Sequence, residues 1–124
     1  MLHGGIITIF VSDFAQALDF YRNSLGFSLE YLVEHKWACL DAGGGLKLGL
    51  HPRSAQQFVS APHGAISIGF TVSIPLDEAV VQLSARGVRF HGSIADGAEG
   101  NIRMAFFADP DGNEHYLCEY LRNQ

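Results

Sequence analysis

The chain has few cysteines, and this scarcity excludes one class of small protein. Its 124 residues contain only Cys39 and Cys118, which lie 79 positions apart without CxxC spacing. This pattern is not a disulfide framework, and we expect two buried thiols in a reducing compartment. A chain of this length forms one domain that buries roughly two-thirds of its unfolded surface, so it needs no metal or disulfide for stability.

Long apolar runs and basic clusters are also missing. The apolar runs at Ile6–Val11 and Ile66–Val72 have the length of strands and are too short to cross a membrane. No Lys or Arg precedes Arg22, so no secretory signal is expected, and we expect a cytoplasmic protein. The net charge is −5, with no cluster of basic residues, which argues against binding to nucleic acid or to an anionic membrane.

Several enzyme motifs do not occur. The sequence has no GxSxG, HExxH or CxxC spacing and no P-loop. The run Gly43–Gly45 leads into a predicted strand rather than a helix and lacks the P-loop lysine, so it is not expected to bind phosphate. A Cys118 nucleophile paired with His51 is conceivable, although no acid that would orient the histidine is identified.

One pattern of elements, a strand, a helix and three strands, occurs twice. Alternating β-branched residues predict a strand at Ile6–Val11, and Ser12 or Asp13 can cap a helix that begins at Phe14 and ends at Gly26. Further strands are predicted at Phe27–Glu34, Lys36–Asp41 and Leu46–His51, with a glycine turn at Gly43–Gly45 before the last of these.

The second half repeats the first with an offset of 61 residues. A strand is predicted at Ser67–Val72, and a helix follows, with Ser73 as its cap, Pro75 in its first turn and Gly87 as its end. The later strands are Val88–His91, Arg103–Ala108 and Glu114–Tyr120, with a turn at Asp109–Gly112. We therefore expect an α+β fold of one domain, residues 1–124. Its modules span about 1–61 and 64–124, joined at Ser60–Gly64.

Two segments resemble the glyoxalase/bleomycin resistance protein/dioxygenase superfamily, also called the vicinal oxygen chelate superfamily. They are VSDFAQALDFYRNSLGF at residues 11–27 and AFFADPDGN at residues 105–113. The resemblance implies two paired βαβββ modules that form a curved mixed sheet around a cleft, and it implies a homodimer. Members include metal-dependent lyases, epimerases, dioxygenases and thiol transferases, and also metal-free proteins that sequester antibiotics.

The resemblance implies four positions for metal ligands, usually His, Gln or Glu. In this sequence they hold Ile6, Gly49, Ser67 and Tyr116. Isoleucine and glycine have no ligating side chain, and serine and tyrosine are poor ligands for Zn²⁺, Ni²⁺ or Fe²⁺. We therefore expect no metal and no other cofactor at this site.

The six histidines leave one alternative metal site open. Strand alternation gives His51 the parity of Gly49, and Glu114 that of Tyr116, so these two could form a displaced site. By the same alternation, His115 is expected to face the helix. His35, His63 and His91 fall at predicted turns or strand ends, and His3 lies near the terminus.

Alternation also predicts the residues that line the ligand cleft. The lining combines apolar side chains, hydroxyls, one acid and one base, which suits a flat or amphipathic organic ligand better than a phosphorylated one. These residues are Ile6, Thr8, Phe10, Trp37, Lys47, His51, Ser67, Thr71, Glu114, Tyr116 and Cys118, with Gly49, Gly69 and either Phe106 or Phe107 beside them.

Three functions are compatible with this pattern. The first is a metal-free protein that sequesters a small organic ligand, cationic or aromatic, with no bond made or broken. The second is a glyoxalase-type lyase or isomerase that holds a metal through unusual ligands such as His51 and Glu114. The third is metal-independent acid/base catalysis through Glu114, Tyr116 or His51. The missing family ligands favour the first.

Overall fold

The computed structural model describes residues 1, 5–53, 66–96 and 102–121. The chain divides into two compact units, Met1–Pro62 and His63–Gln124, and each is described by itself. The predicted joint at Ser60–Gly64 lies outside the described residues, as do His3 and His63.

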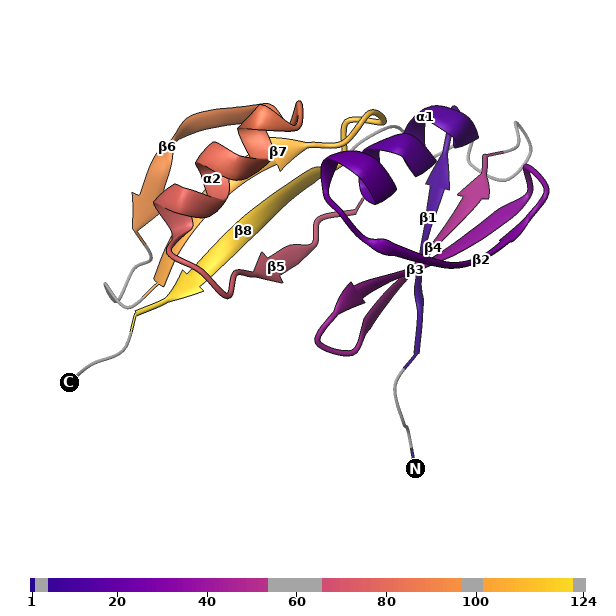
Figure 1. Cartoon of the computed structure of the whole chain (residues 1–124), viewed down its shortest axis with the longest axis horizontal. Coiled ribbons are helices and arrows are strands. Elements are labelled where there is room, and N and C mark those ends of the chain that lie inside the picture. Colours follow the sequence, from indigo (N-terminus) through magenta and orange to yellow (C-terminus); the bar gives the residue numbers. More distant parts are fainter. Residues whose placement is uncertain (2–4, 54–65, 97–101, 122–124) are drawn as a thin grey trace. The chain divides into compact units, whose positions relative to one another are not determined.

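The first unit is a four-stranded mixed sheet with one helical segment (Figure 1). Its elements are β1 (Ile7–Val11), α1 (Phe14–Asp19), η1 (Phe20–Ser24), β2 (Ser28–Val33), β3 (Trp37–Gly43) and β4 (Leu46–Pro52). The strand order is β1-β4-β3-β2, with β1 parallel to β4 and the other pairs antiparallel.

The second unit repeats this order. Its elements are β5 (Gly69–Thr71), α2 (Leu76–Ala85), β6 (Phe90–Asp96), β7 (Ile102–Ala108) and β8 (Glu114–Tyr120). The sheet runs β5-β8-β7-β6, and again only the pair formed by the first strand, β5 with β8, is parallel. The predicted α+β fold of two βαβββ modules is confirmed.

The first helix begins as predicted, but its last turn before Gly26 is not α-helical. Asp13 caps it, because its Oδ1 accepts a hydrogen bond from the Gln16 backbone N–H at 3.0 Å. From Phe20 onward the helix widens into the π-helical turn η1, where the Leu25 N–H donates to the Phe20 carbonyl five residues earlier. Such turns are rare and often occur at functional sites.

Other boundaries correct the sequence prediction. Ser73 is not the cap of α2, which begins after Pro75 without a side-chain hydrogen bond at its N-terminus. The strand predicted at Ser67–Val72 is reduced to β5, whereas the strand predicted at Val88–His91 extends to Asp96 as β6. The pairing of β6 with β7 shifts register between His91 and Ala95, beside Gly92 with φ +74°. A bulge of this kind lets a strand continue past an irregular position.

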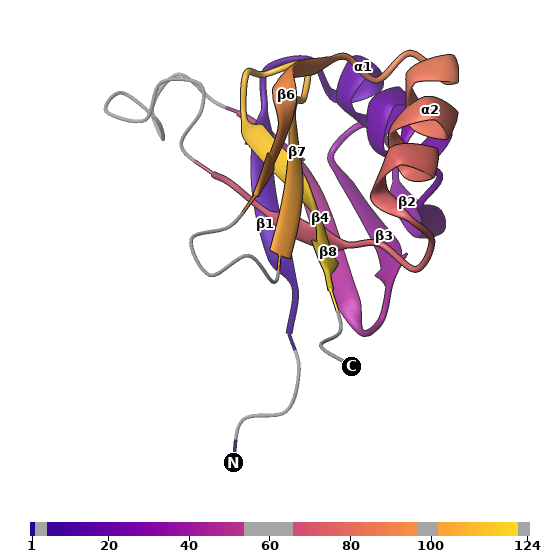
Figure 2. The same cartoon turned by 90° about the vertical axis from the view of Figure 1, so that its left-hand side faces the viewer.

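In each unit one face of the sheet packs against the helix. In the first unit Ile9, Val11, Leu48 and Leu50 are fully buried on that side, and α1 contacts β4. In the second unit α2 contacts β7 and β8, and Figure 2 shows the helix on one side of these strands. Side chains of the alternate residues lie on the opposite side, which we call the helix-distal face of each sheet.

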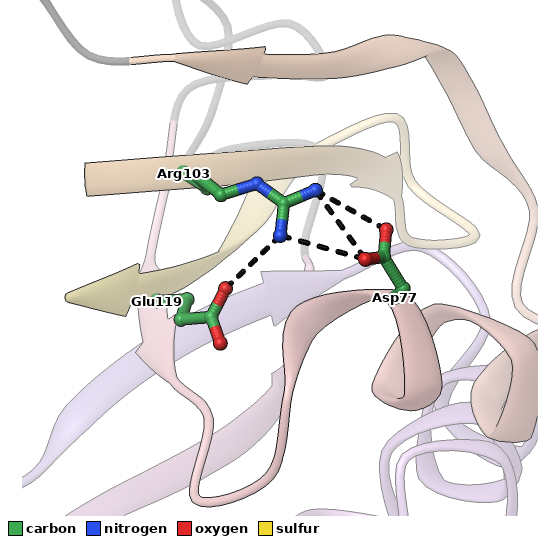
Figure 3. A network of polar contacts seen from close by, with 3 residues as sticks. All are labelled: Asp77, Arg103 and Glu119. Atoms are coloured by element: carbon green, nitrogen blue, oxygen red, sulfur yellow. Dashed lines mark hydrogen bonds and ion pairs between the residues drawn. The ribbon is translucent and has the colours of Figure 1, made fainter. Parts of the chain in front are cut away.

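A network of ion pairs joins α2 to its sheet. The Arg103 guanidinium contacts Asp77 of α2 at 3.2 Å and Glu119 of β8 at 3.3 Å (Figure 3). Hydrogen bonding to Asp77 raises the pKa of Arg103. Because these groups are partly exposed, the network orients α2 on the sheet more than it stabilises the fold.

The turn between β2 and β3 contains a strained residue. Glu34 has φ +48° and is the only non-glycine residue with a positive φ in the described parts of the chain. The left-handed conformation costs an ordinary residue about 1–2 kcal/mol, and glycine adopts it freely. This turn therefore stores local strain that one substitution can release.

Replacing Glu34 with glycine is expected to raise the free energy of unfolding by about 0.5–1 kcal/mol. Lys36→Gly in the same turn is the matched control, because Lys36 has no positive φ, and it is expected to lower stability. Urea denaturation followed by circular dichroism measures both variants. Equal destabilisation by the two would contradict a release of strain at Glu34.

Candidate functional site

A tryptophan ring covers the centre of the helix-distal face of the first sheet. Gly49 on β4 pairs with Thr8 on β1 and with Cys39 on β3. A Cβ atom added to Gly49 would lie only 2.1 Å from Cη2 of Trp37, so the indole rests directly on the glycine backbone. Glycine at this position is thus what allows Trp37 to lie across β4.

Other aromatic side chains surround Trp37. The ring centroids of Trp37 and His51 are 6.5 Å apart, and those of His51 and Phe10 are 5.4 Å apart. The Trp37 Nε1–H donates to the Tyr31 hydroxyl at 3.1 Å, which fixes the indole in its plane. We call Phe10, Tyr31, Trp37 and His51 the aromatic cluster. It presents ring faces and edges suited to stacking with a planar ligand.

His51 presents one ring nitrogen as an acceptor. Its Nδ1 lies 2.8 Å from the Pro52 carbonyl oxygen. Since a carbonyl can only accept, Nδ1 carries the proton and neutral His51 has its lone pair on Nε2. Neutral His51 therefore adds a hydrogen-bond acceptor to the aromatic cluster beside the Tyr31 hydroxyl.

A charged pair lies on the same face as the aromatic cluster. The Lys47 ammonium forms an ion pair with Glu30, and the Cys39 thiol donates to the same carboxylate at 3.6 Å. Burial, with a contribution from the bond to Glu30, raises the pKa of Cys39. Cys39 therefore remains a neutral thiol near pH 7 and is poorly suited to act as a nucleophile.

The helix-distal face of the second sheet has its own aromatic centre. A Cβ atom added to Gly69 would lie 2.4 Å from Cζ of Tyr116, so the phenol ring covers that glycine. Phe106 packs beside Tyr116 with ring centroids 5.6 Å apart. Thr71 pairs with Cys118 on the adjoining strand, and the Cys118 side chain is buried.

An acid/base pair lies on this second face. The His91 Nε2 is 2.6 Å from Oε2 of Glu114, and both side chains are about half exposed. His91 was predicted at the end of a strand. In the structure β6 continues beyond His91, and His91 pairs with Phe106 on β7. Glu114 thus has a histidine partner that alternation alone did not identify.

The structure places the remaining predicted site residues as follows. Ile6 and Ser67 precede β1 and β5 and are exposed. Of the two phenylalanines, Phe106 shares the face of Tyr116, whereas Phe107 is fully buried in the core. His115 is fully buried on the helix side as predicted, and its Nδ1 accepts from the Ile68 N–H at 3.0 Å.

Sequence reasoning missed Glu30 and Tyr31. Both contact the helix-distal face because the pairing of β2 with β3 shifts register between Leu29 and Tyr31. No pattern in the sequence marks this bulge. The result is that two successive residues of β2 contribute to one face of the sheet.

The residues at the four family ligand positions do not fit a metal ion. Gly49 offers no donor and lies under the Trp37 indole, and the Tyr116 ring is spread over Gly69. Ile6 has no donor atom, which leaves Ser67 and Tyr116 as weak oxygen ligands. Within the ranges that the structure describes, no three His, Cys, Asp or Glu side chains form a group that could hold a metal.

Gly49→Ala is expected to lower the free energy of unfolding by about 1–3 kcal/mol, because its methyl group would overlap the Trp37 ring. The displaced indole would lose its bond to Tyr31 and become more exposed, so its fluorescence emission should shift to longer wavelength. Trp37 is the chain's one tryptophan, which makes emission specific to this site.

Gly69→Ala is the matched control for this prediction. It creates the same kind of overlap, with Tyr116, in the other unit. Its stability should fall similarly while the Trp37 emission remains unchanged. An unshifted emission in Gly49→Ala would show that the indole does not rest on Gly49.

The chain repeats one βαβββ module. In each module an aromatic ring covers a glycine on the helix-distal face of the sheet. Residues 5–115 match the family model described as the Glyoxalase/Bleomycin resistance protein/Dioxygenase superfamily, and the chain belongs to this superfamily. The chain is 27% identical over 120 residues to the virulence protein STM3117 of Salmonella typhimurium, with 93% of this chain and 82% of that protein covered.

Two solved structures show the likeness in three dimensions. TnmS3, an antibiotic-binding protein from a Streptomyces species, is 26% identical with a TM-score of 0.75, and 97% of each chain is covered. A superfamily member from Sphaerobacter thermophilus is 28% identical with a TM-score of 0.75, covering 96% of this chain and 98% of that one.

Among the described residues, no helix has the length and apolar character that crossing a membrane requires.

Proposed function

We propose that this protein binds and sequesters a small planar organic molecule without a metal. The observation that carries the proposal is Trp37, whose indole lies over Gly49 at a position where the family resemblance implies a metal ligand. An aromatic ring at this place provides a stacking surface instead of a donor atom. The antibiotic-binding neighbour TnmS3 supports a ligand of this kind.

Each helix-distal face would offer its own set of contacts to a ligand, made by the residues that alternation selects. In the first unit these are Thr8, Phe10, Trp37, Lys47 and His51, with Ile6 before the strand. In the second they are Thr71, Glu114, Tyr116 and Cys118, with Ser67 before the strand. Aromatic rings would hold the planar part of the ligand. Aromatic ring faces and the Glu114 carboxylate would favour a cationic group over an anionic one, whereas Glu30 is already paired with Lys47.

Fluorescence titration with two planar probes tests this proposal. Proflavine is cationic and acridone is neutral, so together they separate stacking from charge. We expect proflavine to quench Trp37 emission with saturation, and acridone to bind more weakly. Failure of both probes and of a diverse antibiotic panel to bind or to raise the melting temperature would overturn the proposal.

Metal analysis of protein purified without a His-tag is the second test of this proposal. Titration with Zn²⁺, Ni²⁺ and Fe²⁺ is expected to give no tight binding, because the family ligand positions lack donors. Stoichiometric metal would instead support a glyoxalase-type enzyme. His51→Ala and Glu114→Ala would then show whether these two residues hold the ion.

The contact between His91 and Glu114 favours a second candidate, metal-independent acid/base catalysis. The 2.6 Å separation of their polar atoms would allow a proton to pass between them beside Tyr116. A bound ligand that is recovered chemically changed, and is unchanged with Glu114→Gln, would favour this function. A ligand recovered intact from the wild-type protein would favour sequestration.

We also propose that the protein is a cytoplasmic homodimer. Cys39 and Cys118 are free thiols, as suits a reducing compartment. Strand β2 lies at the edge of the first sheet, where its outer backbone groups would pair with a second copy. Light scattering during gel filtration measures the mass, and a monomer would refute the dimer.

A further inference from the structure

A pocket of about 250 Å³ lies in the first unit, away from the proposed ligand face. It is formed by α1, η1, β2 and the turn that follows β2, of which α1 and β2 are labelled in Figure 1. Its apolar lining comes from Phe14, Leu18 and Leu32. The ring of His35 also lines the pocket and stands edge-on to Phe14, with ring centroids 6.5 Å apart.

Two opposite charges line this pocket without being neutralised. Neither the Arg22 nor the Glu34 side chain has a hydrogen-bond or ion-pair partner among the described residues. The other carboxylate in the lining, Asp19, is engaged, because its Oδ1 accepts from Asn23 Nδ2 at 2.7 Å. The pocket therefore offers one cation, Arg22, and one carboxylate without a partner in the described parts of the chain, Glu34, beside an apolar surface, while the Asp19 carboxylate adds a second negative charge.

Two irregular stretches of backbone carry these charges. Arg22 belongs to the π-helical turn η1, and Glu34 has the strained φ of +48°. Both irregularities cost stability, and such features tend to persist where function requires them. Because both irregular stretches contribute a charged residue to the lining of one pocket, we treat it as a built site.

We propose that this pocket binds a free α-amino acid with an apolar side chain. Arg22 would bind the carboxylate, Glu34 the ammonium group, and Phe14, Leu18 and Leu32 the side chain. The volume lies below the range of roughly 300–1,000 Å³ typical for drug-sized ligands, which excludes a large antibiotic. This site is independent of the planar-ligand function proposed above.

Binding of L-leucine, followed by the amide spectrum of ¹⁵N-labelled protein, tests the site. Signals of α1, η1 and the β2–β3 turn should shift with saturation. Isoamylamine lacks the carboxylate and isocaproate lacks the ammonium group. Each should bind roughly tenfold more weakly, because one charge-assisted contact is lost. Equal binding of all three, shifts confined to other parts of the chain, or no binding at about 10 mM leucine would overturn the proposal.

Substitutions at the two charges separate recognition from folding. Arg22→Gln and Glu34→Gln should each weaken leucine binding roughly tenfold. Arg86→Gln and Glu78→Gln, which remove exposed charges in the second unit, should leave it unchanged. Glu34→Gly should lose binding while becoming more stable, a combination that a merely structural Glu34 would not produce. Unchanged leucine affinity in the Arg22 and Glu34 variants would overturn the proposal, whatever the result with proflavine.

Discussion

Asp109→Ala is expected to lower the free energy of unfolding by about 3–5 kcal/mol, one of the two largest effects predicted for this chain. The carboxylate is almost fully buried. Its Oδ1 accepts from the backbone N–H groups of Asp111 and Asn113 at 3.0 and 2.8 Å, and its Oδ2 accepts from the Asn113 side chain at 2.9 Å. Alanine would leave these buried donors without an acceptor.

The loss of structure in Asp109→Ala should extend beyond the turn. Asn113 in turn accepts from the Ile66 N–H at 3.2 Å, and His115 lies 3.7 Å from the Asp109 carboxylate while it accepts from Ile68. The chain segment before β5 is thus connected to the turn through two side chains. Loss of Asp109 would loosen both the turn and the entry to β5.

Urea denaturation followed by far-UV circular dichroism measures this effect. Pro110→Ala is the matched control, because Pro110 is exposed in the same turn, and its expected cost is below about 1 kcal/mol. Asp109→Asn should lower the free energy of unfolding by an amount between those of Asp109→Ala and Pro110→Ala. One acceptor oxygen remains in this variant, but its new amide group faces the Asn113 amide. If Asp109→Ala cost no more than Pro110→Ala, the buried carboxylate would not anchor this turn.

Most of the fold could be predicted from local sequence signals. The alternation of Ile9 and Val11 with Thr8 and Phe10 predicts a strand and separates its two faces, and Ile9 and Val11 are on the buried one. Gly26 and Gly87 mark the ends of helical segments because each takes a positive φ, 84° and 96°, that other residues avoid. Signals of this kind depend only on neighbours in the sequence, so they can be recognised without the structure.

The details of the candidate site could not be predicted in the same way. The overlap of Trp37 with Gly49 depends on strand register, and the contribution of Glu30 depends on a bulge in β2. The pairing of His91 with Glu114 required β6 to continue through a second bulge. Register and bulges are decided by packing between distant segments, so alternation alone gives the face of a residue but not its partners.

The Asp109–Gly112 turn shows the same division. Its position was predicted from Pro110 and Gly112, and Gly112 does take a positive φ of 82°. The importance of Asp109 was not predicted, because its bonds become visible only when the turn folds over its own carboxylate. A motif can therefore locate a turn correctly and still conceal which side chain stabilises it.

Trp37→Ala is expected to weaken binding of proflavine roughly 5- to 150-fold, because it removes the ring on which a planar ligand would stack. Loss of one aromatic stacking partner costs about 1–3 kcal/mol, which converts to this range. Since the variant lacks the fluorescent residue, isothermal calorimetry must replace quenching. Trp37→Phe should retain most of the affinity, as it preserves a ring at this position.

Two further variants connect the effect to the structure. Tyr31→Phe removes the hydroxyl that accepts from Trp37 Nε1 and should cost less than threefold, on the order of 0.5 kcal/mol. Val81→Ala, an exposed change on α2, should leave binding unaffected. The loss of proflavine affinity should therefore be largest in Trp37→Ala, smaller in Tyr31→Phe and absent in Val81→Ala. This order is expected because the indole binds the ligand and the phenol only orients the indole. An equal loss in Tyr31→Phe and Trp37→Ala would mean that the position of the ring matters as much as its presence. Full affinity in Trp37→Ala would place the ligand elsewhere on the protein.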